Sequence, residues 1–287
     1  LAGKYVDMLT KKSVIRELSE YAVARGREIG YENVFDYTLG NPSVPVPESF
    51  NNSIIRLIGE KSPMDLHGYS QSLGIAEVRT AVAESLNRRF GMNYTMDHIF
   101  MTSGAAGAIA HAVRLVCEPN DEVITFAPFF PEYIPYITHA GVELKVVKPS
   151  LTDFQINFEA FEEMINERTM AVLVNTPNNP SGIVYSEATI KKLSKILLDK
   201  SREYGHIIYL ISDEPYREIV FDGKSQPYPA KYYDATITCY SFSKSLSVPG
   251  ERIGYVAVNP ACPDACKMIV MCGQISRGIG HNCPSSI

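Results

Sequence analysis

Apolar residues along the chain occur by turns in short continuous runs, which are typical of buried strands, and at the spacing of a helix face. This pattern predicts strands that alternate with helices. Short runs rich in β-branched and aromatic residues predict strands at 98–102, 122–126, 170–175, 207–212 and 235–240. Apolar residues at helical spacing predict helices at 14–22, 75–90, 104–117 and 186–204, the first capped by Ser13. Strands alternating with helices form a largely parallel sheet, so we expect an open α/β sheet sandwiched by helices. A further short strand is expected at 35–39, before the turn Gly40-Asn41-Pro42.

Residues able to do chemistry gather directly after several predicted strands. They lie at 104–106, 130, 179, 213 and 241–244. The carboxyl ends of parallel strands meet at one edge of an open sheet, which is where such sheets bind ligands. The sequence therefore predicts a ligand site at that edge.

The residue types at this edge indicate what the ligand carries. Gly104 and the two alanines after it open a helix and leave its first N–H groups bare, so a phosphate fits there. Asp213 leaves a buried strand, where a carboxylate is costly to desolvate unless a cation or donor meets it. Lys244 lies among small hydroxyl residues, and Arg252 supplies the cation that would lower its pKa and make its amine a useful nucleophile.

Composition and charge narrow the class of protein. The chain has 287 residues, 45% of them hydrophobic, which is ample for a buried core, and its net charge of -5 offers no basic field for nucleic acid. The first 30 residues of the sequence contain no continuous apolar segment of signal-peptide type, and no stretch is long enough to span a membrane, so we expect a cytoplasmic protein without a membrane partner. The six cysteines, interpreted as reduced thiols rather than metal ligands, lie at 117, 239, 262, 266, 272 and 283.

Two nucleotide-binding motifs are incomplete in this sequence. The glycines at 104 and 107 do not form Gly-x-Gly-x-x-Gly, and Gly223-Lys224-Ser225 lacks the upstream glycine of a phosphate-binding loop because Glu218 stands there. An NAD-dependent dehydrogenase is therefore a distant alternative.

Six short motifs, in order along residues 13 to 258, resemble those of the class I and II aminotransferases, the aspartate aminotransferase superfamily of fold type I pyridoxal phosphate enzymes. They are Gly40-x-Pro42, Tyr69-x-x-x-x-Gly74, Pro128-Phe-Phe130-x-x-Tyr133, Asn179-Pro-x-Gly182, Asp213-x-x-Tyr216, and Ser241-x-Ser243-Lys244 with Gly250-x-Arg252-x-Gly254.

The resemblance implies a role for each of these residues toward pyridoxal 5'-phosphate. Lys244 would form the Schiff base and move the proton, and Asp213 would face the pyridine nitrogen. Phe130 would stack on the ring, while Asn179 and Tyr216 would bind its phenolic oxygen. The phosphate would be held by Gly104, Ala105, Ala106, Ser241, Ser243 and Arg252. Gly40 and Asn179 would contact the substrate, and Tyr69 would reach the neighbouring subunit's phosphate in a homodimer.

The resemblance also implies an organisation and an activity. Residues 1–45 would be an N-terminal segment with part of a small domain, and residues 46–287 the cofactor-binding large domain. Relatives continue beyond the equivalent of Ile287 into an arginine that anchors the substrate carboxylate, and Arg277 lies too early to match it. We therefore expect that the remainder of the small domain is absent and that turnover is poor.

The activity implied is transfer of an amino group between an L-amino acid of the aspartate or aromatic type and a 2-oxo acid. A C–S lyase or decarboxylase using the same site remains an alternative, as does a cofactor-binding domain with little turnover. A non-catalytic regulatory domain is disfavoured by the intact Lys244, Asp213, Asn179 and Arg252. The identity of the donor amino acid is left open.

Overall fold

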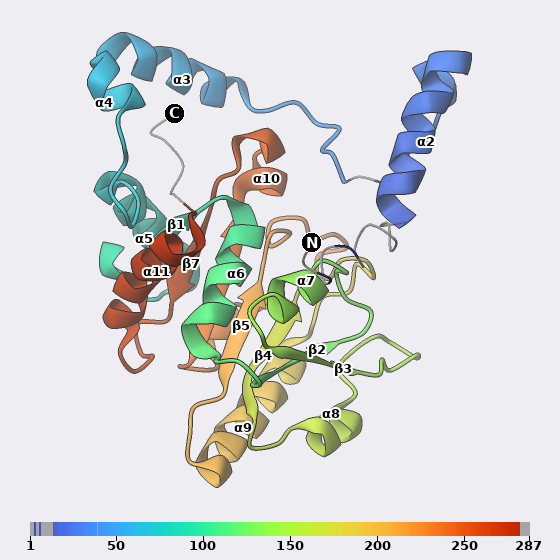
Figure 1. Cartoon of the computed structure of the whole chain (residues 1–287), viewed down its shortest axis with the longest axis vertical. Coiled ribbons are helices and arrows are strands. Elements are labelled where there is room, and N and C mark those ends of the chain that lie inside the picture. Colours follow the sequence, from blue (N-terminus) through green and yellow to red (C-terminus); the bar gives the residue numbers. More distant parts are fainter. Residues whose placement is uncertain (1–2, 4–5, 7–13, 39, 282–287) are drawn as a thin grey trace. The chain divides into compact units, whose positions relative to one another are not determined.

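In the computed structural model, the described residues are 3, 6, 14–38 and 40–281. The chain divides into two compact units, residues 1–45 and residues 46–287 (Figure 1). The first unit contains helix α2 (Val14–Ile29) and the 3-10 turn η1 (Tyr31–Asn33). Ser13, expected to cap α2, lies outside the described residues.

The short strand expected at 35–39 is wrong for the part that is described. Phe35, Asp36 and Tyr37 have no regular secondary structure, and Thr38 lies in a bend. The Asp36 carboxylate accepts hydrogen bonds from the backbone N–H and the hydroxyl of Thr38, at 2.8 and 2.6 Å. This local side-chain bond turns the backbone, which competes with the extended form that a strand needs.

A single seven-stranded sheet organises the second unit. In chain order its strands are β1 (Ile99–Thr102), β2 (Glu122–Phe126), β3 (Glu143–Val147), β4 (Thr169–Asn175), β5 (Tyr209–Asp213), β6 (Thr236–Ser241) and β7 (Gly254–Val258). Across the sheet their order is β1-β7-β6-β5-β4-β2-β3. The pairs from β6 to β3 are parallel, whereas β7 is antiparallel to both β1 and β6. The mostly parallel open sheet is confirmed, with β7 as an antiparallel insertion.

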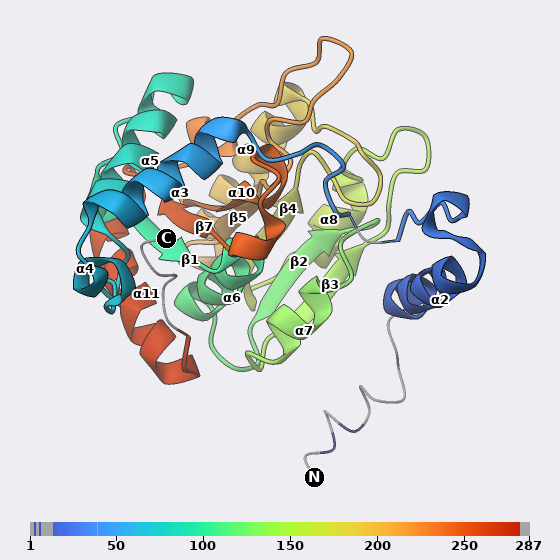
Figure 2. The same ribbon diagram turned by 90° about the horizontal axis from the view of Figure 1, so that it is seen from above.

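Helices connect the strands and cover both faces of the sheet. They are α3 (Glu48–Glu60), α4 (Pro63–His67), α5 (Ala76–Phe90), α6 (Gly104–Val116), α7 (Tyr133–Thr138), α8 (Phe158–Met164), α9 (Glu187–Tyr204), α10 (Phe242–Ser245) and α11 (Ala265–Ile279), with 3-10 turns η2 (Met96–His98), η3 (Pro229–Lys231) and η4 (Pro249–Glu251). Figure 2 shows α6 and α9 on opposite faces. No helix in the described ranges combines the length and the hydropathy needed to span a bilayer.

The core lies between the sheet and these helices. Every residue of β1, β2, β6 and β7 is buried, as expected of strands covered on both faces. Helix α6 packs the apolar face formed by Ala108, Ile109, Ala112 and Val113 into it. This packing fixes the start of α6 at the end of the sheet where α10 also lies (Figure 1).

The strand ends place polar residues side by side at that end. Strands β4, β5 and β6 finish at Asn175, Asp213 and Ser241. The parallel register pairs Asn175 with Asp213. A side chain at the end of each strand therefore faces the same edge of the sheet.

Candidate active site

A cavity at the carboxyl edge of the sheet brings six predicted residues together. The residues lining it are Ala105, Ala106, Ile109, Phe130, Tyr136, Asn175, Asn179, Asp213, Pro215 and Tyr216. They come from the first half of α6, the loop after β2, helix α7, the end of β4 with the loop after it, and the end of β5 with the residues after it. The sequence did not single out Ile109, Tyr136, Asn175 or Pro215 for this site.

Asp213 is the buried charge of the cavity, with only 4% of its surface exposed. Burial raises the pKa of its carboxyl to about 7, a hydrogen bond from Tyr133 lowers it, and the charge of Glu214 raises it. Its Oδ1 is buried and, among the described residues, accepts no hydrogen bond. A buried acceptor without a donor is costly, so this oxygen is suited to a donor that enters the cavity.

Asn175 links Asp213 to the loop that carries Asn179. Its amide nitrogen donates to the backbone carbonyl of Asp213 at 3.0 Å, and its Oδ1 accepts from the backbone N–H of Asn179 at 2.6 Å. The side-chain amide of Asn179 donates in turn to the hydroxyl of Tyr216 at 3.2 Å. Asn179 and Tyr216 thus form one polar pair on the wall of the cavity.

The start of α6 has the features of an anion site. Ser103, the residue before the helix, makes no side-chain capping bond, so the first N–H groups remain available. Arg252 donates from its guanidinium to the carbonyl of Ser103 at 3.3 Å. A Cβ on Gly104 would lie 2.8 Å from that guanidinium, and one on Gly254 would lie 2.8 Å from Gly104. Gly104 therefore allows Arg252 to approach the helix, and Gly254 allows the start of β7 to approach Gly104.

Lys244 lies on the short helix α10, directly after β6. Ser241 precedes that helix, and its hydroxyl donates to the hydroxyl of Ser243 at 2.7 Å while accepting the Ser243 N–H at 3.2 Å. Burial and the positive charge of Arg252 lower the pKa of the Lys244 amine. The structure thus gives Lys244 the cationic neighbour that the sequence predicted.

Seven predicted residues are not among those that line this cavity: Gly104, Ser241, Ser243, Lys244, Arg252, Tyr69 and Gly40. Tyr69 has a fully exposed side chain, at 102% of its reference area, in the loop before α5. Gly40 belongs to the first unit, and the residues that line the cavity belong to the second. Their roles stay predictions.

Behind the cavity, a buried ion pair follows Asp213 in the chain. The Arg217 guanidinium contacts the Glu214 carboxylate at 2.6 Å, and both side chains are at most 2% exposed. The hydroxyl of Ser212 donates to the other Glu214 oxygen at 2.8 Å. The rings that stack against the guanidinium are Phe90, Tyr228 and Tyr240, at 4.8 to 5.2 Å.

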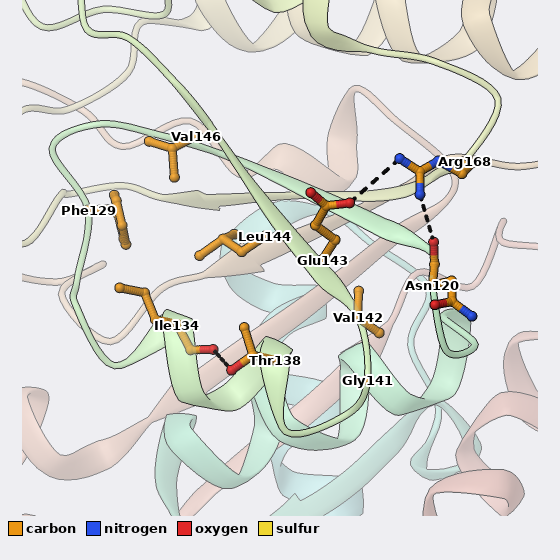
Figure 3. Close-up of a pocket in the computed structure, with 10 residues that line it drawn as sticks. All are labelled: Asn120, Phe129, Ile134, Thr138, Gly141, Val142, Glu143, Leu144, Val146 and Arg168. Carbon is orange, nitrogen blue, oxygen red and sulfur yellow. Dashed lines mark hydrogen bonds and ion pairs between the residues drawn. The ribbon is translucent and has the colours of Figure 1, made fainter. Parts of the chain in front are cut away.

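A second cavity, of about 560 Å³, lies between α7 and the edge strand β3 (Figure 3). Its wall is mainly apolar, and Phe129, Ile134 and Leu144 contribute to it. Its guanidinium, that of Arg168, is engaged by Glu143 at 3.5 Å and by the carbonyl of Asn120 at 3.4 Å. None of the predicted site residues lines this cavity, so the cavity at Asp213 is the stronger candidate for the active site.

Five of the six cysteines lie within the described residues. Cys117, Cys239, Cys262 and Cys266 are free thiols, and Cys283 lies outside the described residues. Within the described ranges, no group of three or more His, Cys, Asp or Glu side chains is placed to hold a metal ion.

Comparison with known proteins gives consistent similarities. Residues 33–279 match the family model described as aminotransferase class I and II. The chain is 31% identical over 255 residues to the aspartate aminotransferase of Thermotoga maritima, covering 85% of this chain and 65% of that protein. It is 32% identical over 239 residues to a probable aspartate/prephenate aminotransferase of Aquifex aeolicus, covering 81% of this chain and 57% of the relative.

Solved structures agree with the sequence relatives. The crystal structure of an amino transferase from Eubacterium rectale matches with a TM-score of 0.95 at 45% identity, over 100% of this chain and 72% of that one. The aspartate aminotransferase of Thermus thermophilus with maleate matches with a TM-score of 0.82 at 26% identity, over 99% of this chain and 69% of that one. This chain thus spans less than two thirds of the length of the two curated relatives.

Proposed function

The chain belongs to the class I and II aminotransferase family, and we propose that it binds pyridoxal phosphate at the Asp213 cavity and transfers an amino group between an L-amino acid of the aspartate or aromatic type and a 2-oxo acid. Enzymes of this family depend on pyridoxal phosphate. The observation that carries the proposal is the buried, unpartnered Oδ1 of Asp213. A protonated pyridine nitrogen is the donor that this oxygen lacks.

The other residues of the site fit the rest of the cofactor. Ala105 and Ala106 at the start of α6, with Gly104 before them, would hold the phosphate. Ser241 and Ser243 add hydroxyl groups, and Arg252 adds a charged, multidentate donor. Phe130 supplies a ring on the cavity wall, and the pair of Asn179 and Tyr216 would hold the phenolic oxygen.

The chemistry then divides between cofactor and chain. When bound, pyridoxal phosphate supplies an electron-withdrawing ring that stabilises negative charge at the substrate carbon. Lys244 accepts and returns the proton at that carbon, and its lowered pKa brings the amine closer to the pH at which proton transfer is efficient. Asp213, with its unpartnered Oδ1, would accept a hydrogen bond from the protonated pyridine nitrogen.

The partner and substrate are part of the same proposal. Maleate, bound in the Thermus thermophilus relative, is a dicarboxylate, which supports an aspartate-type substrate. Full exposure of Tyr69 supports the prediction that its hydroxyl serves the neighbouring subunit of a homodimer. The cytoplasmic location stays a prediction.

The test is an absorption spectrum of the purified chain with pyridoxal phosphate, followed by borohydride reduction and mass mapping of the modified lysine. We expect one adduct, on Lys244, that is lost in Lys244→Ala. Lys224→Ala, which removes a lysine of the exposed loop after β5, serves as the matched control and should leave the adduct unchanged. An adduct spread over many lysines would contradict the proposed site.

Product analysis with L-aspartate and 2-oxoglutarate tests the reaction itself. A 2-oxo acid with equimolar glutamate supports amino transfer, whereas pyruvate with ammonia or a thiol, formed from a suitable sulfur amino acid, would indicate a lyase. An adduct on Lys244 without any turnover would limit the proposal to cofactor binding.

A further inference from the structure

Tyr133, the first residue of α7, points its hydroxyl at Asp213. The hydroxyl donates a hydrogen bond to Oδ2 of Asp213 at 2.5 Å, although 80 residues separate the two in the chain. The side chain is fully buried. Phe129 stacks on its ring at 6.3 Å and Phe130 meets it edge-on at 5.7 Å, so neighbouring rings fix where the hydroxyl lies.

The two oxygens of Asp213 have different surroundings as a result. Oδ2 accepts from Tyr133, and the amide of Asn175 lies 3.5 Å from the same oxygen. Oδ1 accepts no hydrogen bond from the described residues and is buried. Because both donors bind one oxygen, they fix the orientation of the carboxylate plane and leave the other oxygen for the cavity.

We propose that Tyr133 is a positioning residue that keeps the Asp213 carboxylate ionised and turned with Oδ1 toward the cofactor ring. The inference rests on the proposed function and adds to it a residue that lines no part of the cavity. Tyr133 acts through Asp213 and does not touch the reacting atoms.

The hydrogen bond from Tyr133 favours the ionised form of Asp213, which is the form that the proposed role requires. A hydrogen bond from Tyr133 lowers the pKa of Asp213, and burial raises it. Burial raises the pKa of Tyr133 well above its usual value, so the hydroxyl stays a donor. The other titratable groups that act on Asp213 or feel its charge are Tyr136 on α7, Glu214 and Tyr216 after β5, and Cys239 on β6.

The experiment follows the Asp213 carboxyl in the cofactor-free chain by NMR, with ¹³C-labelled aspartate and Asp213→Asn to assign the signal. In Tyr133→Phe we expect Asp213 to be about tenfold weaker as an acid, because a hydrogen bond to a charged group is lost. Tyr233→Phe is the matched control, since its buried hydroxyl donates to the carbonyl of Ile208 at 2.7 Å. It should leave the Asp213 titration unchanged.

A second variant keeps the test informative if Tyr133→Phe does not fold. Fluorotyrosine at position 133 preserves the shape of the side chain and makes the hydroxyl a stronger donor, so Asp213 should become a stronger acid. A purely structural role for Tyr133 predicts no such change.

The outcomes separate this inference from the proposed function. Uptake of pyridoxal phosphate by the wild-type chain, together with identical Asp213 titrations in wild type, Tyr133→Phe and the fluorotyrosine variant, would overturn the inference alone. No uptake by the wild-type chain would overturn the proposed function, and with it the role given to Tyr133.

Discussion

At the scale of single residues, the charge of Arg252 acts on two parts of the site. It hydrogen-bonds beside the first turn of α6, and it lowers the pKa of the Lys244 amine. The same guanidinium would therefore bind the phosphate and keep the amine reactive.

Replacing this cation with a neutral donor should change both effects at once. In Arg252→Gln we expect affinity for pyridoxal phosphate to fall about tenfold or more, because charge-assisted hydrogen bonds are lost. Loss of the positive charge raises the pKa of Lys244, so adduct formation should need a higher pH. Absorbance titrations from neutral to alkaline pH measure both. Arg277→Gln, which changes an exposed arginine of α11, is the control, and equal effects in the two variants would contradict the assignment.

Some functional residues were predictable only with their motif, and others only with the structure. Lys244 and Asp213 each stand in a specific motif. Tyr133 belongs, with Phe130, to the motif Pro128-Phe-Phe130-x-x-Tyr133. Asn175 had a weaker signal, namely a polar residue that ends an apolar strand. Its task depends on the register that pairs it with Asp213, and register is a long-range property that local sequence does not contain.

At the scale of elements, close packing at Gly254 joins the start of β7 to the start of α6. A Cβ there would meet the carbonyl of Tyr240 and lie 2.8 Å from the backbone of Gly104. These are backbone atoms, which move only if the elements themselves shift.

We therefore expect Gly254→Ala to lower the free energy of unfolding by about 1–3 kcal/mol, the cost of overpacking, and to weaken phosphate binding. Urea denaturation and cofactor titration measure these effects. Gly250→Ala provides the control, because no atom lies within 4 Å of its added Cβ. An unchanged stability of Gly254→Ala would show that α6 and β7 can separate freely.

The buried pair after β5 gives a second prediction at this scale. Glu214→Gln or Arg217→Met alone should cost about 3–5 kcal/mol of unfolding free energy, because each leaves a buried charge uncompensated. The double variant should recover part of that loss. The exposed pair of Lys195 and Asp199 is the comparison, and Lys195→Met should change stability by less than about 0.5 kcal/mol. Additive losses in a double-mutant cycle would contradict a coupled pair.

The elements most fully predicted from sequence are those in which pattern and end signals agree. Helix α9 begins after Ser186, whose hydroxyl accepts the N–H of Thr189 at 3.0 Å, and it stops at Gly205 with φ of 75°. Strand β2 has its expected bounds. The strand predicted at 35–39 is wrong in its described part because only the local pattern supported it. Its aromatic residues favour a strand, but the described part of the first unit offers no neighbouring strand for it to pair with.

At the scale of the whole molecule, the proposed dimer predicts that a site needs residues from two chains. In Tyr69→Phe we expect weaker cofactor affinity, since a phosphate donor is lost from the neighbouring site. Mixing Tyr69→Phe chains with Lys244→Ala chains should restore adduct formation in part, because hybrid dimers combine an intact Lys244 with an intact Tyr69. Quantified adduct in the mixture, compared with each variant alone, measures this.

The control for that experiment is Tyr37→Phe, which changes an exposed tyrosine of the first unit. If Tyr69→Phe alone forms less adduct and mixing it with Lys244→Ala chains does not restore adduct formation, Tyr69 acts within its own chain.

The position of β7 between β1 and β6 has a consequence for biosynthesis. A ribosome completes β1 well before it reaches residues 254–258, so β1 lacks its sheet partner β7 while the residues between them are translated. The anion site at the start of α6 also waits for Arg252, and the nascent chain therefore gains its cofactor pocket only as β7 emerges. Limited proteolysis of ribosome-bound chains that end before and after β7 would reveal this late closure, and early protection of β1 would contradict it.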